Sequence, residues 1–141
     1  MITALFVGIF INSLIINLYA SPLLHRVKRW ENESTLIEVI RTLPKPISIS
    51  TQNQIAPHFS HNQYVYVFPQ IENAEYVLIN TKIDEIWPIE SADKFKQYLG
   101  ALRAGEKLPP IKLPFKKTPT VQEFKYNLIL EKDGIMLFKV A

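Results

Sequence analysis

The side chains with the most chemical potential lie close together, where hydroxyl, amide and imidazole groups follow a short apolar run. They are Thr51, Gln52, Asn53, His58, Ser60 and His61. A polar turn that follows a strand and opens a helix can present side chains and free N–H groups to a ligand. The sequence therefore predicts a ligand-binding site at these positions, although many turns of this kind are only connectors.

Two of these residues, His58 and His61, are three positions apart, so their imidazoles could share a metal ion. A zinc site needs a third protein ligand, and no residue at a fixed spacing supplies one. Glu72, Asp84 or Glu85 would serve only if the fold brought one of them close. We therefore predict no metal and no cofactor. One histidine is expected to bond the loop backbone and the other to be solvated.

The chain contains no complete catalytic set, and we predict no catalytic residue. Its glycines are Gly8, Gly100, Gly105 and Gly134, and none lies between a strand and a helix start, as a phosphate-binding loop would require. No serine stands in a nucleophile elbow. The absence of cysteine excludes disulfides and thiolate chemistry. The net charge of +3, with no RNA-type aromatic motif, makes nucleic acid an unexpected partner.

The N-terminal stretch, residues 1–24, has no charged side chain. At about 1.5 Å of rise per residue, a helix of this length reaches the roughly 30 Å of a bilayer core. We predict a transmembrane helix over residues 1–24, with membrane lipid as a partner, and a soluble α/β domain over residues 25–141. A cleaved signal peptide is the main alternative, because Ala20-Ser21 is a tolerable cleavage site, but the positive start of such leaders is missing.

The elements that position the polar turn can be predicted from periodicity. Strands are expected at residues 47–50, 64–68 and 75–80, which are alternating, aromatic or continuously apolar. Helices are expected at residues 34–43, capped by Ser34 and stopped by Pro44, and from Ser91 to just before Gly105. The helices should present apolar faces to the sheet. These faces consist of Leu36, Ile37, Ile40 and Leu43 in the first helix and Phe95, Tyr98, Leu99 and Leu102 in the second.

Asp133-Gly134 lies between two β-rich runs and predicts an antiparallel hairpin at the C-terminus. The predicted fold is therefore an N-terminal transmembrane helix followed by a small, Rossmann-like, three-layer α/β domain with this hairpin. Residues 69–74 are short for a crossover between parallel strands. The second strand is therefore left open as a brief edge strand or an antiparallel one.

Four segments in combination resemble a known family. They are Ser50-Thr51-Gln52-Asn53, Ala56-Pro57-His58-Phe59-Ser60-His61, Tyr64-Val65-Tyr66-Val67-Phe68-Pro69 and Ala74-Glu75-Tyr76-Val77-Leu78-Ile79. The pattern resembles the C-terminal domain of predicted prokaryotic polytopic membrane proteins that are catalogued as a domain of unknown function, number twenty-seventy-nine. The resemblance extends from Pro22 to the end, and the preceding helix is similar to the last membrane span of that family.

The resemblance implies a many-helix protein similar to C-type glycosyltransferases, which use lipid-linked sugar donors. Their acidic catalytic residues are expected near the start of the membrane part, which precedes the region of similarity, so none is transferred to this chain. The family context also implies a place at the cell membrane, with the soluble domain on the extracytoplasmic side. Arg26, Lys28 and Arg29 favour the cytoplasmic side by the positive-inside rule, and we follow the family.

The leading hypothesis is a terminal membrane span plus accessory soluble domain of an uncharacterised glycosyltransferase-like integral membrane protein. It would be non-catalytic on its own, and a polytopic membrane part encoded upstream would be its partner. The alternative is a single-pass, membrane-anchored binding module for a small anionic ligand or metal. A third hypothesis is a purely structural domain.

Overall fold

The computed structural model of the chain contains one mixed β-sheet with helices packed against it, and it describes residues 31–62, 64–83, 89, 91–110 and 124–141. Residues from Glu31 onward form one unit. In chain order its elements are α2 (Glu33–Thr42), β1 (Ser48–Thr51), the 3-10 helix η1 (Ala56–Phe59), β2 (Tyr64–Val67), β3 (Tyr76–Asn80), α3 (Ala92–Arg103), β4 (Tyr126–Lys132) and β5 (Ile135–Val140).

The sheet has five strands in the order β2-β1-β3-β5-β4. β1 lies parallel to both β2 and β3, whereas β5 is antiparallel to β3 and to β4. β2 is therefore a parallel edge strand, which answers the question left open by the short connection after it. Every residue of β3 is buried, as expected of a central strand covered on both faces.

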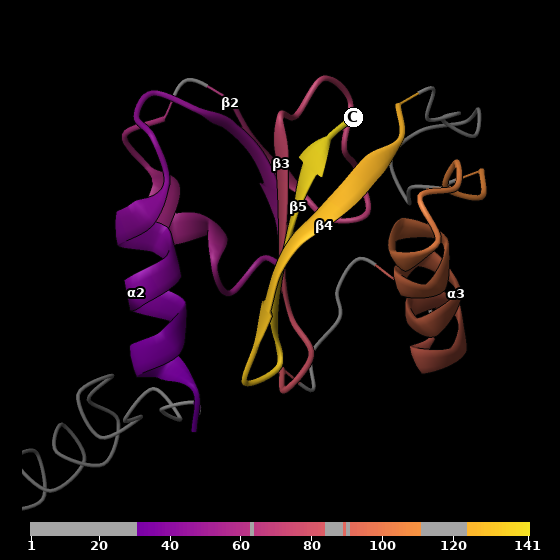
Figure 1. Cartoon of the computed structure of the whole chain (residues 1–141), viewed down its shortest axis with the longest axis horizontal. Coiled ribbons are helices and arrows are strands. Elements are labelled where there is room, and N and C mark those ends of the chain that lie inside the picture. Colours follow the sequence, from indigo (N-terminus) through magenta and orange to yellow (C-terminus); the bar gives the residue numbers. More distant parts are fainter. Residues whose placement is uncertain (1–30, 63, 84–88, 90, 111–123) are drawn as a thin grey trace, which may run out of the picture. The chain divides into compact units, whose positions relative to one another are not determined.

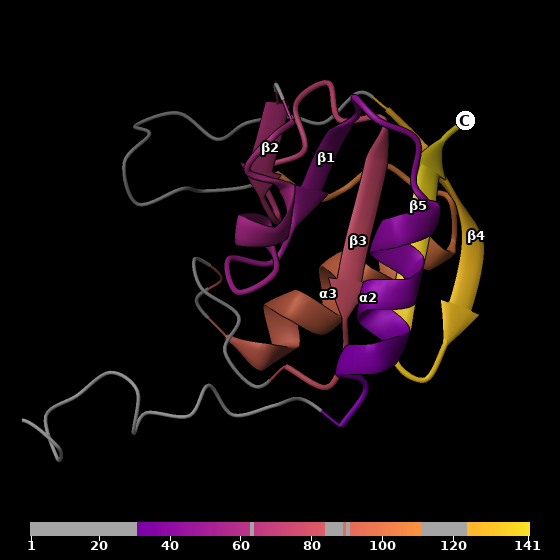
Figure 2. The ribbon, with the colours of Figure 1, turned by 90° about the vertical axis from the view of Figure 1, so that its left-hand side faces the viewer.

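The two α-helices cover opposite faces of the sheet. Figure 1 views the sheet nearly edge-on, with α2 to its left and α3 to its right, and Figure 2 shows α2 in front of β3. On its buried side α2 carries Leu36, Val39 and Ile40. The face under α3 is more aromatic, because the ring of Phe68 meets Phe95 and Tyr98 edge-on at centroid distances of 6.2 and 6.3 Å.

The N-cap predicted for α3 is confirmed, whereas the one predicted for α2 is wrong. Ser91 caps α3 as predicted, because its Oγ accepts a hydrogen bond from the Lys94 N–H at 3.3 Å. Ser34 does not cap α2. That helix begins at Glu33, and Asn32 occupies the N-cap position without a capping side-chain bond. The Asn32 side chain has a different partner, described below.

The predicted hairpin is present. Asp133 and Gly134 connect β4 to β5 with φ angles of 51° and 81°, the combination that a two-residue type I′ turn requires. A Cβ on Gly134 would lie 3.0 Å from Thr81 Oγ1. The glycine is therefore required both by its backbone angle and by the close approach of the β3 end.

The predicted fold class needs one correction. It included an N-terminal transmembrane helix, but none of the helices in the described residues combines the length and the apolarity that crossing a membrane requires. The segment to which that helix was assigned, residues 1–24, lies outside the described residues. The fold that the structure supports is a mixed α/β arrangement of one five-stranded sheet and two α-helices.

We predict that Gly134→Ala destabilises the protein by about 1–2 kcal/mol, because alanine resists a positive φ and its Cβ would crowd Thr81. The matched control is Gly100→Ala in α3, where a Cβ would meet nothing within 4 Å. That change should stabilise by about 0.5–1 kcal/mol. Urea unfolding of both variants measures the difference, and equal effects would contradict the assigned turn.

Candidate functional site

Thr51, Gln52 and Asn53 of the predicted site lie where parallel strands end, and the later residues follow as the loop returns to the start of β2. β1 ends at Thr51, with Gln52 directly after it, and the neighbouring β3 ends at Asn80. In α/β sheets ligands bind outside the carboxyl ends of parallel strands, at the point where successive connections leave in opposite directions. β1 is such a position, because β2 and β3 flank it on either side.

Thr51 and Gln52 are buried and hold the following loop to the sheet. The Thr51 hydroxyl donates to the Leu78 carbonyl at 2.7 Å, and the Asn80 N–H donates to Gln52 Oε1 at 2.7 Å. The main-chain carbonyl of Gln52 also accepts from the N–H groups of Ile55 and Ala56, at 2.9 and 3.0 Å. These two residues therefore anchor the loop, and their bonded atoms face the protein.

The other predicted residues lie on the surface. Asn53, His58, Ser60 and His61 are all exposed, whereas Ile55 and Phe59 of the same loop are buried. The structure thus separates the predicted set into an anchoring pair and an exposed polar group, which we call the loop tip. We define the loop tip as Asn53, His58, Ser60 and His61.

A metal centre is not formed in the described part of the chain, where no group of three or more His, Asp or Glu side chains is placed to hold an ion. Of the possible third ligands for the histidines, Glu72 is described, whereas Asp84 and Glu85 lie outside the described residues. The chemistry available at the loop tip is therefore hydrogen bonding by amide, hydroxyl and imidazole groups.

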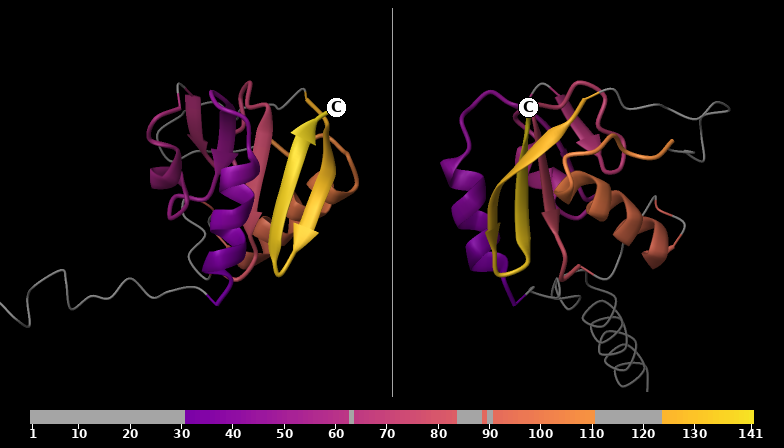
Figure 3. Two further views of the ribbon diagram at one scale, coloured as in Figure 1. Left: turned by 60° about the vertical axis from the view of Figure 1, so that its left-hand side comes forward. Right: turned by 45° about the vertical axis from the view of Figure 1, so that its right-hand side comes forward.

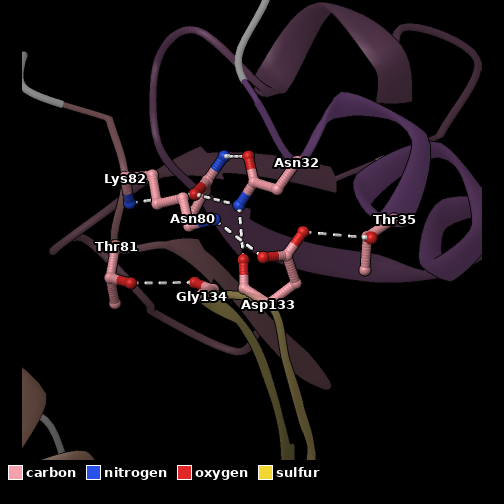
Figure 4. A network of polar contacts seen from close by, with 7 residues as sticks. All are labelled: Asn32, Thr35, Asn80, Thr81, Lys82, Asp133 and Gly134. Carbon is pink, nitrogen blue, oxygen red and sulfur yellow. Dashed lines mark hydrogen bonds and ion pairs between the residues drawn. The ribbon is translucent and has the colours of Figure 1, made fainter.

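Beside this loop the structure forms a polar cluster that the sequence analysis did not predict (Figure 4). We call it the asparagine network. It joins the start of α2, the end of β3 and the β4–β5 turn, and consists of Asn32, Thr35, Asn80, Thr81, Lys82, Asp133 and Gly134.

At its centre the buried amides of Asn32 and Asn80 bond each other reciprocally. Asn32 Nδ2 donates to Asn80 Oδ1 at 2.9 Å, and Asn80 Nδ2 donates to Asn32 Oδ1 at 3.0 Å. Asn32 Nδ2 also donates to the main-chain carbonyl of Asp133 at 2.8 Å, and the Lys82 N–H donates to Asn80 Oδ1 at 3.0 Å. The pair is well satisfied, so its evident role is to hold three segments together.

The outer part of the network is an ion pair. Lys82 Nζ lies 2.7 Å from Asp133 Oδ1, and the Thr35 hydroxyl donates to Asp133 Oδ2 at 3.4 Å. The hydrogen bond from Lys82 lowers the pKa of the Asp133 carboxyl, and the same bond raises the pKa of the Lys82 ammonium. Both groups are exposed, so solvent screens the pair and its contribution to stability is small.

One polar atom next to the network remains unpaired. The side-chain nitrogen of Gln52 is buried and has no hydrogen-bond partner among the described residues. Buried donors without a partner are rare in native proteins, and each requires an explanation. A hydrogen-bond acceptor brought by a ligand would satisfy this one.

The network residues were missed because the contacts are not local. Asn80 and Asp133 were assigned to a strand end and to a turn, and their local roles were correct. Asn32 and Asn80 are 48 positions apart, and no pattern in the chain connects them. The signal that could have indicated the network is Asn80, a polar residue at the end of the otherwise apolar, buried strand β3.

Comparison of the chain with protein-family models, with curated proteins and with solved structures finds no match. The family resemblance and the activity it implies therefore stay predictions.

We predict that Asn80→Leu destabilises the protein by about 1–3 kcal/mol, because it leaves the Asn32 amide oxygen and the Lys82 N–H without their partners. The double variant Asn32→Leu with Asn80→Leu should be less destabilised than the sum of the single variants, since both amides are then removed together. Chemical unfolding of all four proteins gives the coupling energy. Additive effects would show that the pair is not coupled.

A second prediction concerns acid. The pKa of the Asp133 carboxyl is lowered in the folded protein, so the ionised carboxylate contributes to the unfolding free energy above pH 3.8, its ordinary pKa. This contribution is lost as the pH falls through the lower pKa of the folded state. Because the pKa of the Lys82 ammonium is raised, the ion pair stays intact up to pH 10.5, the ordinary pKa of that group. Asp133→Asn tolerates the positive φ of the turn but removes the charge.

The wild type should therefore lose more unfolding free energy than Asp133→Asn between about pH 5 and about pH 2. The control is Glu106→Gln, which removes an exposed negative charge away from the network. If the acid dependence of the Asp133→Asn variant equalled that of the wild type, the ion pair would have no part in stability.

Proposed function

We propose that residues 31–141 form an accessory, non-catalytic domain of a glycosyltransferase-like integral membrane protein, in which the loop tip contacts the membrane part or an acceptor substrate. The proposal concerns the α/β unit alone and includes no membrane span within this chain. In this proposal the domain lies at the cell membrane, on the extracytoplasmic side, beside a polytopic membrane part encoded upstream.

The observation that carries the proposal is the division of the loop into anchors and an exposed tip. Thr51 and Gln52 are buried and bonded to β3, and Ile55 and Phe59 are buried as well. The tip residues between and after them are exposed. A loop that is held rigidly and carries polar groups outward is typical of binding surfaces.

Two further features support a recognition role over a chemical one. The polar side chains at the end of β3 are engaged with one another, and so are those of the β4–β5 turn. The segments that carry the family resemblance include both the anchors and the tip. A domain of this kind would contribute position and affinity, whereas the acidic catalytic residues would come from the membrane part.

A second candidate function is binding of a small anionic ligand. The unpaired Gln52 side-chain nitrogen favours it, because a phosphate or carboxylate oxygen would supply the missing acceptor. His58 and His61 lie in the same loop and would add positive charge when protonated.

The test uses a photo-crosslinking amino acid in place of Ser60 in the full-length chain, expressed in its native cells. We expect an adduct with the polytopic membrane protein encoded upstream. Replacing Asn53, His58 and His61 together by alanine should abolish the adduct and change the unfolding free energy by no more than about 0.5 kcal/mol, because all three side chains are exposed.

A crosslinker at Gln97, an exposed position of α3, serves as the matched control and should give no such adduct. Equal adducts from both positions, or none from Ser60, would refute the proposed contact. If the alanine variant lost stability and nothing else, the purely structural hypothesis would be preferred. Heat of binding with inorganic phosphate, in a chain that forms no adduct, would favour the anion-binding candidate.

A further inference from the structure

A short loop connects β2 to β3 and lies across one face of β1. β2 is the edge strand and β1 lies between it and β3 (Figure 3, left), so residues 68–75 must cross β1 to reach the start of β3. Two small residues of β1 hold this loop. Ser50 Oγ donates to the Gln70 carbonyl at 2.8 Å, and Ser48 Oγ donates to the Asn73 carbonyl at 3.3 Å. The loop is therefore fixed on the face of the sheet that the two serines share.

Two tyrosines of β2 lie on the same face, beside this loop. Tyr64 and Tyr66 are paired with the two serines in the parallel register, so their side chains project from the face that carries the loop. Tyr64 is 47% exposed, and the Tyr66 hydroxyl donates to Asn73 Oδ1. Partial burial raises the pKa of the Tyr66 hydroxyl, and the charge of the nearby Glu72 raises it further. The two rings, Asn73 and Glu72 therefore lie close together.

The loop adds polar groups to the two rings. Gln70 is partly exposed and its Nε2 donates to Glu72 Oε1, while Glu72 and Asn73 are both exposed. The amide of Asn73 carries an NH₂ donor besides the oxygen that Tyr66 uses, and carboxylate and amide oxygens can each accept more than one hydrogen bond. We define the tyrosine patch as Tyr64, Tyr66, Gln70, Glu72 and Asn73. It presents an exposed ring with donors and acceptors beside it.

The backbone of Glu72 indicates that its side chain has a use other than folding. Its φ angle is 46°, inside a tight turn in which the Ala74 N–H donates to the Ile71 carbonyl at 2.9 Å. Glycine adopts a positive φ without strain, whereas a residue with a Cβ resists it. Residues held in such conformations are concentrated at functional sites. A glutamate where glycine would fit the turn better therefore favours a role for its carboxylate at the surface.

The groups of the tyrosine patch suit a neutral sugar ring. One face of a pyranose consists of C–H groups that can stack on an aromatic ring, and its hydroxyls both donate and accept hydrogen bonds. An anion would be repelled by the charge of Glu72. A cation would use the rings and the carboxylate but would leave the donor of Asn73 without a role.

We propose that the tyrosine patch binds a neutral sugar unit of a carbohydrate, with its ring stacked on Tyr64 and its hydroxyls bonded to Glu72 and Asn73. This proposal goes beyond the accessory role proposed above and does not depend on it, because the patch and the loop tip share no residue. One stacking ring at an exposed site makes few contacts. The dissociation constant for a monosaccharide should therefore be about 1 mM.

The first test is saturation-transfer-difference NMR of the full-length chain with three probes, methyl glucoside, methyl galactoside and methyl N-acetylglucosaminide. Transfer to the ring C–H hydrogens of at least one probe is expected. Tyr64→Ala should weaken binding about fivefold or more, whereas Tyr64→Phe keeps the ring and should remain within about twofold of the wild type. The matched control is Phe124→Ala, which removes a ring 46% exposed next to the opposite edge strand and should change nothing.

The second test separates binding from folding. Glu72→Gly should unfold at the same or a higher urea concentration than the wild type, because glycine suits the positive φ. The same variant should bind the responding probe about tenfold more weakly, because a charge-assisted hydrogen bond is lost. Unchanged binding in this variant would contradict a role for Glu72 in the site.

Two results of the NMR experiment would overturn the proposal. One is the absence of transfer to all three probes, and the other is transfer that Tyr64→Ala leaves unchanged. Choline serves as a cationic comparison. If choline bound and the sugars did not, and Glu72→Gly abolished that binding, the patch would be a site for a cation and the sugar proposal would be wrong.

Discussion

The reciprocal hydrogen bonds between Asn32 and Asn80 are the interaction on which the arrangement of the α/β unit depends. Two amides buried without partners would be costly, so the start of α2 and the end of β3 must stay together. The bond from Asn32 to the Asp133 carbonyl adds the β4–β5 turn to the same point. Asn32 gives up a conventional capping bond to serve this purpose.

The same hydrogen bonds also limit which polar groups near the strand ends are available to a ligand. Asn80 accepts and donates through its side chain within the network, while its N–H bonds Gln52 and so holds the loop after β1. The polar groups nearest the strand ends are therefore used for structure. Exposed polar groups remain at the loop tip, which is where the proposed recognition role places the contact.

The two edges of the sheet differ in character. β2 is a short parallel edge that packs near η1, whereas β4 is a longer antiparallel edge with a bulge and exposed apolar residues. The loop tip follows β1, and β3 and β5 lie between β1 and β4. The loop tip and the β4 edge therefore belong to different parts of the sheet.

Features that depend on neighbouring residues could be predicted from the amino-acid sequence. The Asp133-Gly134 hairpin, the Ser91 cap and the buried strand ending at Asn80 were all predictable, because turn angles, capping and periodicity are local properties. The loop around Thr51 was located correctly, but which of its side chains are buried was not. The burial of these side chains, the parallel direction of β2 and the pairing of Asn32 with Asn80 became known only from the folded chain. These depend on segments brought together across the sheet, and no local preference encodes which distant segment a strand or an amide will meet.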